Sequence, residues 1–179
     1  TYWRWEAALS PEFCHAALQH VDWATAEAAS INNLNTPADP SIRVTDVLFQ
    51  DPMQPLGCIA RTYIEVANQA AGWNYTLSAQ EDTQIARYKS IDNGHYDWHM
   101  DSTPPQDGVQ RKLTCVILLS DPADFEGGVL QFKNLENETP LDKQGTIIVF
   151  PSFVEHKVTP VTKGVRYTAV TWANGPSFK

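Results

Sequence analysis

Cysteine is scarce in this chain, and long apolar runs are absent. The three cysteines, Cys14, Cys58 and Cys115, are odd in number, lie far apart and form no Cys-x-x-Cys pair. This pattern argues against a disulfide framework and a cysteine zinc site, so we expect a reducing, cytoplasmic location. No stretch reaches the ~18 apolar residues of a membrane span, and no charged-then-apolar leader is present. We therefore expect neither a membrane span nor a signal peptide.

Positive charge is also in short supply. Thirteen lysines and arginines stand against 21 aspartates and glutamates, which gives a formal net charge of −8. Because such a chain repels phosphate backbones, we expect a protein, peptide or small-molecule partner, and neither nucleic acid nor a membrane. A chain of 179 residues that is 42% hydrophobic can form one well-packed core, so we expect a single domain over residues 1–179. The oligomeric state stays open.

The first part of the chain is predicted to be mainly helical. Ser10 and Pro11 supply a cap and a first-turn proline for a helix that we expect to end near Trp23. Apolar residues recur at helical spacing over residues 55–72 and predict a second helix. Between the two, residues 42–50 are rich in β-branched side chains and predict a strand. We interpret residues 1–72 as a helical support.

The rest of the chain changes to short apolar runs separated by turns, which predicts antiparallel strands. The predicted strands are WNYTL, QIARYKSI, RKLTCVILLS, VLQFKN, GTIIVF, HKVTPV and VRYTAVTW. The predicted fold class is therefore mostly β with supporting α-helices. We expect a sandwich or jelly roll over residues 73–179, with the N-terminal helices packed on the sheet.

Residues 95–101 read HYDWHMD, which contains two overlapping His-x-Asp pairs, His95/Asp97 and His99/Asp101. Because side chains alternate along a strand, both members of either pair would point the same way and could bind one metal ion. Periodicity alone does not choose between the pairs. It does place Trp98 on the face opposite His99, where we expect it to fill a core.

A metal site needs a third ligand, and the chain has only five histidines. His15 and His20 fall on the predicted first helix, where we expect solvated or capping side chains. His156 follows a turn and opens a predicted strand, so it is the candidate third ligand of a two-histidine, one-carboxylate site. Arg166 comes ten residues later, on the same face as Trp172. A guanidinium pointing inward there requires an anionic partner, which predicts an anionic ligand.

Five motifs occur in order between residues 83 and 173. They are Tyr88 with GHYxxHxD, then RKLTCVILLSD, then FEGGVLQF, then FPS, and then HxVxPVxxGxRYxxxxW. With these motifs the chain resembles the iron(II)/2-oxoglutarate dioxygenases of the prolyl 4-hydroxylase type. That family has an aromatic residue three positions before its first metal histidine. Tyr96 matches this position for His99, whereas Asp92 occupies it for His95, so the resemblance implies iron ligands at His99, Asp101 and His156.

The resemblance implies a double-stranded β-helix that binds iron(II) and 2-oxoglutarate, with ascorbate as reductant. The far carboxylate of 2-oxoglutarate would pair with Arg166, and Tyr88 would be the second donor. The residues that match the family's apolar walls by position are Val116, Leu118, Leu130, Val158 and Trp172. Some relatives have tyrosine or threonine in place of Leu118 and Leu130, so the resemblance implies fewer hydrogen bonds to the cosubstrate here.

The activity that the resemblance implies is hydroxylation of a C–H bond with succinate and carbon dioxide as co-products. No side chain would act as a general acid or base. We expect a peptidyl proline as the substrate. The alternatives are a free amino acid or metabolite, and a non-catalytic metal-binding jelly-roll module. The polar segments 30–41 and 102–110 are expected to form a lid over the substrate groove.

Overall fold

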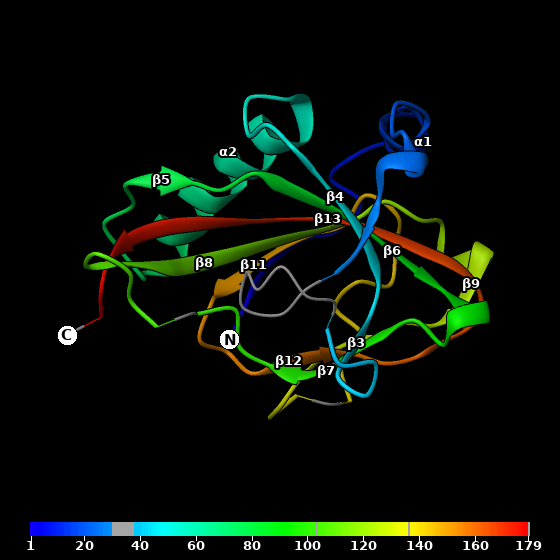
Figure 1. The fold of residues 1–179 in the computed structure, drawn as a ribbon. Helices are drawn as coiled ribbons and strands as arrows, with labels where there is room; N and C mark the ends of the chain where they lie inside the picture. The colour runs from blue at the N-terminus through cyan, green and yellow to red at the C-terminus, as the bar shows by residue number, and fades with distance from the viewer. Residues whose placement is uncertain (30–37, 103, 136, 179) are drawn as a thin grey trace.

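Two antiparallel β-sheets face each other in the computed structural model, which describes residues 1–29, 38–102, 104–135 and 137–178 (Figure 1). In the larger sheet the strand order is β1-β11-β8-β13-β6-β4-β2, and β5 and β9 also pair with β13. In the smaller sheet the order is β10-β12-β7-β3. The predicted fold class, mostly β with helices packed on a jelly roll, is confirmed.

The larger sheet takes strands from both ends of the chain. Its strands are β1 (Trp3–Trp5), β2 (Glu27–Ala28), β4 (Asp46–Gln50), β5 (Ala79–Gln80), β6 (Thr83–Lys89), β8 (Val109–Leu118), β9 (Phe125–Gly127), β11 (Ile147–Pro151) and β13 (Val161–Pro176). The strands of the smaller sheet are β3 (Arg43–Val44), β7 (His95–His99), β10 (Leu130–Phe132) and β12 (His156–Val158). The N-terminal part therefore adds strands to both sheets in addition to the helices expected from its sequence.

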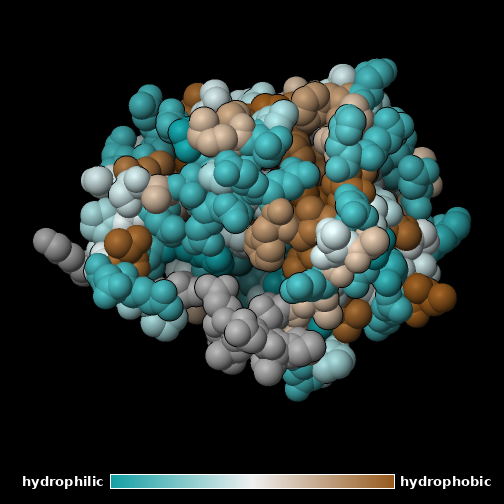
Figure 2. Space-filling view, turned by 45° about the horizontal axis from the view of Figure 1, so that its top comes forward, coloured by the Kyte–Doolittle hydropathy of each residue, from teal (hydrophilic) through white to brown (hydrophobic). Residues whose placement is uncertain are grey.

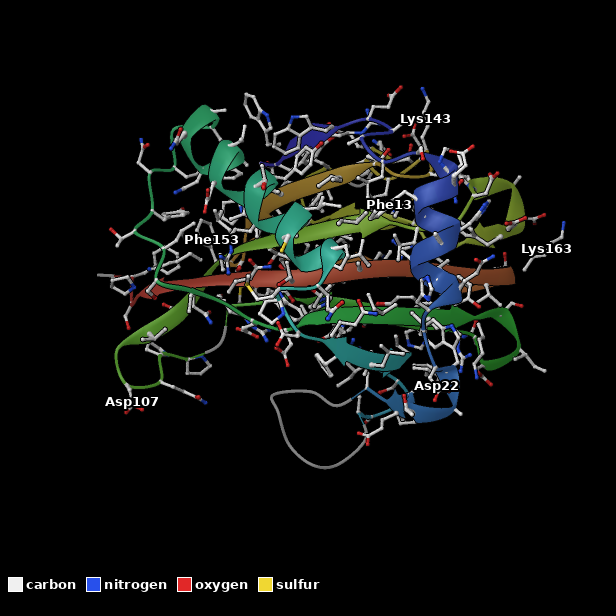
Figure 3. All side chains as sticks on the ribbon, turned by 90° about the horizontal axis from the view of Figure 1, so that it is seen from above. Phe13, Asp22, Asp107, Lys143, Phe153 and Lys163 are labelled. Carbon is white, nitrogen blue, oxygen red and sulfur yellow. The ribbon has the colours of Figure 1, made fainter. Side chains whose placement is uncertain are left out.

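Helices α1 (Pro11–Gln19) and α2 (Pro55–Ala70) lie across the outer face of the larger sheet (Figure 3). The hydroxyl of Ser10 accepts the N–H of Phe13, which caps α1 as predicted. This helix ends at Gln19, earlier than expected, because a separate 3-10 turn capped by Asp22 follows it. Hydrophobic residues reach the surface between the helices, while hydrophilic residues cover most of the rest of that face (Figure 2).

Strand alternation separates two hydrophobic cores. Along β8, Cys115 and Ile117 pack under the helices, whereas Val116 belongs to the core between the sheets. Tyr88 and Val158 lie in that inner core too. Each long strand of the larger sheet therefore supports the helices with one face and lines the interior of the jelly roll with the other.

Two predictions for single strands need correction. Residues 42–50 form two strands, β3 and β4, which belong to different sheets. Residues 73–77 were predicted as a strand, and that prediction is wrong. The side-chain amide of Asn68 on α2 binds both the N–H and the carbonyl of Tyr75, at 2.9 Å each. These backbone groups are therefore satisfied by a helix side chain in place of a strand partner.

Trp98 does lie on the face opposite His99, but it does not fill a core. Its half-buried ring lies on the outside of the smaller sheet, with the Nζ atoms of Lys133 and Lys157 at 4.7 and 4.5 Å from the ring centroid. The interpretation of Trp98 as a core residue is therefore wrong. The ring instead makes cation–π contacts at the surface.

The structure describes the expected lid segments only in part. Residues 30–37 and Thr103 lie outside the described residues, so a lid over the groove stays a prediction. Within the described ranges, neither α-helix combines the length and apolar character that a bilayer crossing requires.

Gly145 gives a test of how the N-terminal segment is fixed to the sheet. It has φ +75, and a Cβ atom there would lie 1.9 Å from the carbonyl oxygen of Leu9. Gly72 has a similar φ of +70 but open space around it. We expect Gly72→Ala to lower the free energy of unfolding by about 1–2 kcal/mol, from backbone strain alone. Gly145→Ala should cost at least ~2 kcal/mol more in urea denaturation, and equal losses would contradict this close approach.

Candidate active site

Three side chains converge where strands of the smaller sheet end. His99 is the last residue of β7, Asp101 follows two residues later, and His156 opens β12. Their potential ligand atoms all lie within 4.8 Å of one another. The Nε2 atom of His99 is 3.6 Å from Oδ1 of Asp101, and that of His156 is 3.6 Å from Oδ2. The carboxylate therefore lies against both imidazole rings.

A β-bulge in the pairing of β7 with β12 determines which residues of the two His-x-Asp pairs face the interior. On β12, one residue separates His156 from Val158, but their partners on β7, His99 and Tyr96, are separated by two residues. The extra residue reverses the alternation of side chains, so Tyr96 and His99 lie on the same face. Their rings are stacked, with centroids 3.4 Å apart and planes 8° apart.

The other pair, His95 and Asp97, lies apart from this cluster. Nδ1 of His95 is 2.8 Å from the carbonyl oxygen of Asn93, and Asp97 is exposed. His15 and His20 are exposed on and just after α1. The structure thus brings together His99, Asp101 and His156 and leaves the remaining histidines elsewhere.

Backbone carbonyls orient both imidazole rings of the cluster. Nδ1 of His99 lies 2.7 Å from the carbonyl oxygen of Asp97, and Nδ1 of His156 lies 2.9 Å from that of Val154. Because a carbonyl oxygen only accepts hydrogen bonds, each Nδ1 carries the proton. Each Nε2 therefore has a free lone pair directed at the cluster, the arrangement that carbonyl partners impose on metal-binding histidines.

Charge in the cluster suits a divalent cation. Burial, reinforced by the nearby His156, lowers the pKa of His99 to about 3, so its ring is neutral at pH 7. Burial alone would raise the pKa of Asp101, but the adjacent His156 and His99 lower it overall. A carboxylate and two imidazole nitrogens are the donor set of non-haem iron(II) oxygenases, so the residues present fit that metal.

Arg166 lies on β13 in the inner core and is only 2% exposed. Its Cζ atom is 5.4 Å from the centroid of the Tyr88 ring, and no carboxylate of the described residues pairs with it. Burial lowers the pKa of Arg166 to about 10, so the guanidinium is still charged at pH 7. A buried cation without an anionic partner in the described chain is costly, which makes Arg166 a candidate for binding an anion.

Gly128 makes room for this arginine. It has φ +60, and a Cβ atom there would lie 2.7 Å from Cδ of Arg166. In the sequence, the two glycines at 127–128 were informative only through the family motif that contains them. The sequence separation between Gly128 and Arg166 gives no sign of this contact, because the two residues meet only in the folded protein.

Comparison with known proteins agrees with this geometry. Residues 83–174 match the 2OG-Fe(II) oxygenase superfamily, where 2OG stands for 2-oxoglutarate. The match covers about half of the chain and includes the three converging ligand candidates and Arg166. The chain belongs to this superfamily. The resemblance inferred from the five motifs is thereby confirmed.

Two curated relatives of this oxygenase are PKHD-type hydroxylases. The one from Synechococcus sp. (strain CC9902) is 38% identical over 128 residues, which cover 68% of this chain and 55% of the relative. The one from Sphingopyxis alaskensis is 43% identical over 86 residues, 44% of this chain and 38% of the relative. The chain thus spans less than two thirds of the length of these relatives.

Solved structures share the whole fold of the oxygenase. The viral collagen prolyl hydroxylase of Paramecium bursaria Chlorella virus-1, in a 2OG complex, has a TM-score of 0.70 at 22% identity and covers 97% of this chain and 96% of its own. A Pseudomonas putida prolyl-4-hydroxylase has a TM-score of 0.70 at 21% identity, with 97% and 92% coverage. At these identities the likeness concerns the fold.

The residues of the predicted apolar wall are all buried in the oxygenase. They are Val116, Leu118, Leu130, Val158 and Trp172. Val116, Leu130 and Val158 belong to the core between the sheets. Arg166 and Trp172 lie on the same strand, β13, six residues apart. The wall, Tyr88 and Arg166 stay predictions as contacts of the cosubstrate.

An ion pair behind Trp172 was missed from the sequence. Arg111 binds Glu81 through Nε at 2.7 Å and through Nη2 at 2.5 Å, and its Cζ lies 3.9 Å from the centroid of the Trp172 ring. The indole Nε1 of Trp172 is buried, and the indole lies close enough to Asp101 to help lower the pKa of that carboxyl group. Glu81 and Arg111 are 30 residues apart, and only the pairing of β8 and β5 with β13 reveals their contact.

A second arginine covers the ring stacked on His99. Cζ of Arg43 lies 4.5 Å from the centroid of the Tyr96 ring, and its Nη2 donates to Oε1 of Gln84 at 3.3 Å. Tyr96 is therefore held between a guanidinium and an imidazole. Its pKa is raised, chiefly by burial, so the phenol stays protonated and able to donate a hydrogen bond.

Metal binding distinguishes the two His-x-Asp pairs directly. We expect Asp101→Ala to weaken binding of cobalt(II), a stand-in for iron(II), by more than ~100-fold, because it removes the anionic donor of the cluster. Asp97→Ala is the matched control and should bind cobalt(II) as the wild type does. Both affinities are measured by competition with a chelator. A large loss for Asp97→Ala and none for Asp101→Ala would move the site to the other pair.

Proposed function

We propose that this oxygenase binds iron(II) through His99, Asp101 and His156 and hydroxylates a peptidyl proline with 2-oxoglutarate as cosubstrate. The observation that carries the proposal is Arg166, a buried charged guanidinium without a carboxylate partner in the described chain. It lies in the same interior as the histidine and aspartate cluster. A metal-binding cluster and an anion-binding cation are the two features that a bidentate keto acid with a distal carboxylate requires.

When bound, iron(II), 2-oxoglutarate and dioxygen supply an oxidation that gives succinate, carbon dioxide and a hydroxylated C–H bond, and ascorbate is the proposed reductant of oxidised iron. The chain supplies positioning. The guanidinium of Arg166 presents two parallel N–H donors to the distal carboxylate, and the Tyr88 phenol adds a third. Leu118 and Leu130 offer no hydrogen bond, so Arg166 and Tyr88 recognise the distal carboxylate by themselves. The apolar wall keeps water from the reacting centre.

The donors around the cluster favour a peptide as the substrate. The indole N–H of Trp172, which lies beside Asp101, and the phenol of Tyr96, whose ring is stacked on that of His99, are hydrogen-bond donors next to the cluster. Peptide carbonyl oxygens are acceptors that match them. A structural neighbour from Trichoplax adhaerens, a prolyl hydroxylase at TM-score 0.69 and 19% identity, is in complex with a peptide.

The experiment that tests the proposal measures succinate formed by the iron(II)-loaded protein with 2-oxoglutarate, oxygen, ascorbate and a proline-containing peptide. We expect succinate together with a peptide that has gained one oxygen atom on proline. Hydroxylation of a free amino acid or metabolite, with none on peptides, would support the alternative substrate class. No succinate under any of these conditions would favour a metal-binding module.

Substitution of Arg166 separates cosubstrate binding from metal binding. We expect Arg166→Ala to raise the 2-oxoglutarate concentration at half-maximal rate by roughly 30-fold or more, because losing a charge-assisted hydrogen bond costs about 2 kcal/mol. The affinity for cobalt(II) without 2-oxoglutarate should stay close to that of the wild type. Equal losses of both affinities would mean that Arg166 only supports the fold.

A further inference from the structure

We propose that the hydroxyl groups of Thr114 and Ser152 form a relay that fixes the carboxylate of Asp101 and leaves Oδ1 as the oxygen that binds metal. This inference rests on the proposed function of the cluster and concerns residues outside the set of ligands. Thr114 lies on β8 and Ser152 directly after β11. Both are 0% exposed, so water does not compete for their hydrogen bonds.

The distances define a short chain of hydroxyl groups. Oγ1 of Thr114 lies 2.9 Å from Oδ2 of Asp101 and 3.0 Å from Oγ of Ser152. An ionised carboxylate only accepts hydrogen bonds, so Thr114 uses its single proton on Asp101. Ser152 must then donate to Thr114. The direction of the relay, from Ser152 through Thr114 to Asp101, follows from the number of protons available.

The same serine also fixes the backbone at the aspartate. Its carbonyl oxygen accepts the N–H groups of Asp101 and Ser102, each at 2.9 Å, and its own N–H donates to the carbonyl of Lys112 at 2.9 Å. Ser152 thus holds the main chain of Asp101 while Thr114 holds its side chain. Strands β8 and β11, which pair with each other in the larger sheet, anchor a residue that follows a strand of the smaller sheet.

The relay assigns different roles to the two carboxylate oxygens. Oδ1 lies 3.6 Å from Nε2 of His99 and Oδ2 lies 3.6 Å from Nε2 of His156, so both oxygens face the imidazole rings. Oδ2 in addition accepts a charge-assisted hydrogen bond from Thr114. A carboxylate free to rotate could bind a metal ion through both oxygens and take a coordination position needed by 2-oxoglutarate or oxygen. The hydrogen bond from Thr114 takes up electron density on Oδ2 and stops the carboxylate from rotating, which favours metal binding through Oδ1 and lowers the entropy lost when the metal binds.

Thr114→Val tests the relay because valine keeps the shape of threonine and removes only the hydroxyl. We expect it to weaken cobalt(II) binding by about 10- to 100-fold, the usual effect of removing a group that orients a metal ligand. Thr114→Ser retains the hydroxyl and should bind cobalt(II) nearly as the wild type does. Thr146→Val is the matched control. Thr146 is also 0% exposed and accepts the N–H of Ala7 at 3.1 Å, away from the cluster.

The measurements are chelator competition for cobalt(II), the visible spectrum of the cobalt(II) protein, and the free energy of unfolding of each metal-free variant. We expect a changed cobalt(II) spectrum for Thr114→Val and an unchanged one for Thr146→Val. If Thr114→Val does not fold, Ser152→Ala decides, with a smaller loss of affinity expected in the same direction. Wild-type affinity in the folded relay variants would overturn the relay, and so would equal loss in Thr146→Val. A wild type that binds no cobalt(II) would overturn the metal site itself.

Discussion

The site depends on one irregular strand pairing, the bulge where β7 meets β12. A regular pairing would place Tyr96 and His99 on opposite faces. The extra residue brings both rings to the interior, sets His99 opposite His156 and leaves Asp101 just beyond the strand, against the end of β11. The bulge thus accompanies the choice of His99 and Asp101 over His95 and Asp97, which strand periodicity alone leaves open. It also leaves Asp97 exposed.

Burial of Arg166 is the second constraint, and it is expensive without an anion. A fully desolvated guanidinium costs several kcal/mol, and the described chain provides only the face of Tyr88 nearby. Gly128 leaves the space that the arginine side chain occupies, because a Cβ atom at this position would lie 2.7 Å from Cδ of Arg166. A protein that keeps such an arrangement gains stability when an anion binds, since the ligand then offsets the desolvation of the cation.

The family motifs made the cluster of His99, Asp101 and His156 predictable, together with the inward position of Arg166, whereas the surroundings of these residues were not predictable. His99, Asp101 and His156 could be named because their spacing matches a family pattern. The long strands β8 and β13 could be predicted because each contains a long apolar, β-branched run. Contacts such as Arg111 with Glu81 depend on strand register, which is decided by pairing across the whole sheet. The short strands β1 and β2 are too brief to leave a periodic signal. The strand predicted at residues 73–77 failed because Asn68 satisfies its backbone from a helix.

The two sheets have separate tasks at the site, and Asp101 is where they meet. The smaller sheet supplies the imidazole rings, and the larger sheet supplies Arg166, Trp172 and the hydroxyl groups that hold the carboxylate. Relative movement of the sheets would therefore change the position of Asp101 with respect to the histidines before it disturbed either sheet alone. Helices α1 and α2 pack on the face of the larger sheet that is turned away from the core between the sheets. They support the sheet that carries Arg166 and the hydroxyl groups that hold Asp101, and under the proposed function the separation of these two residues is the distance that 2-oxoglutarate would span.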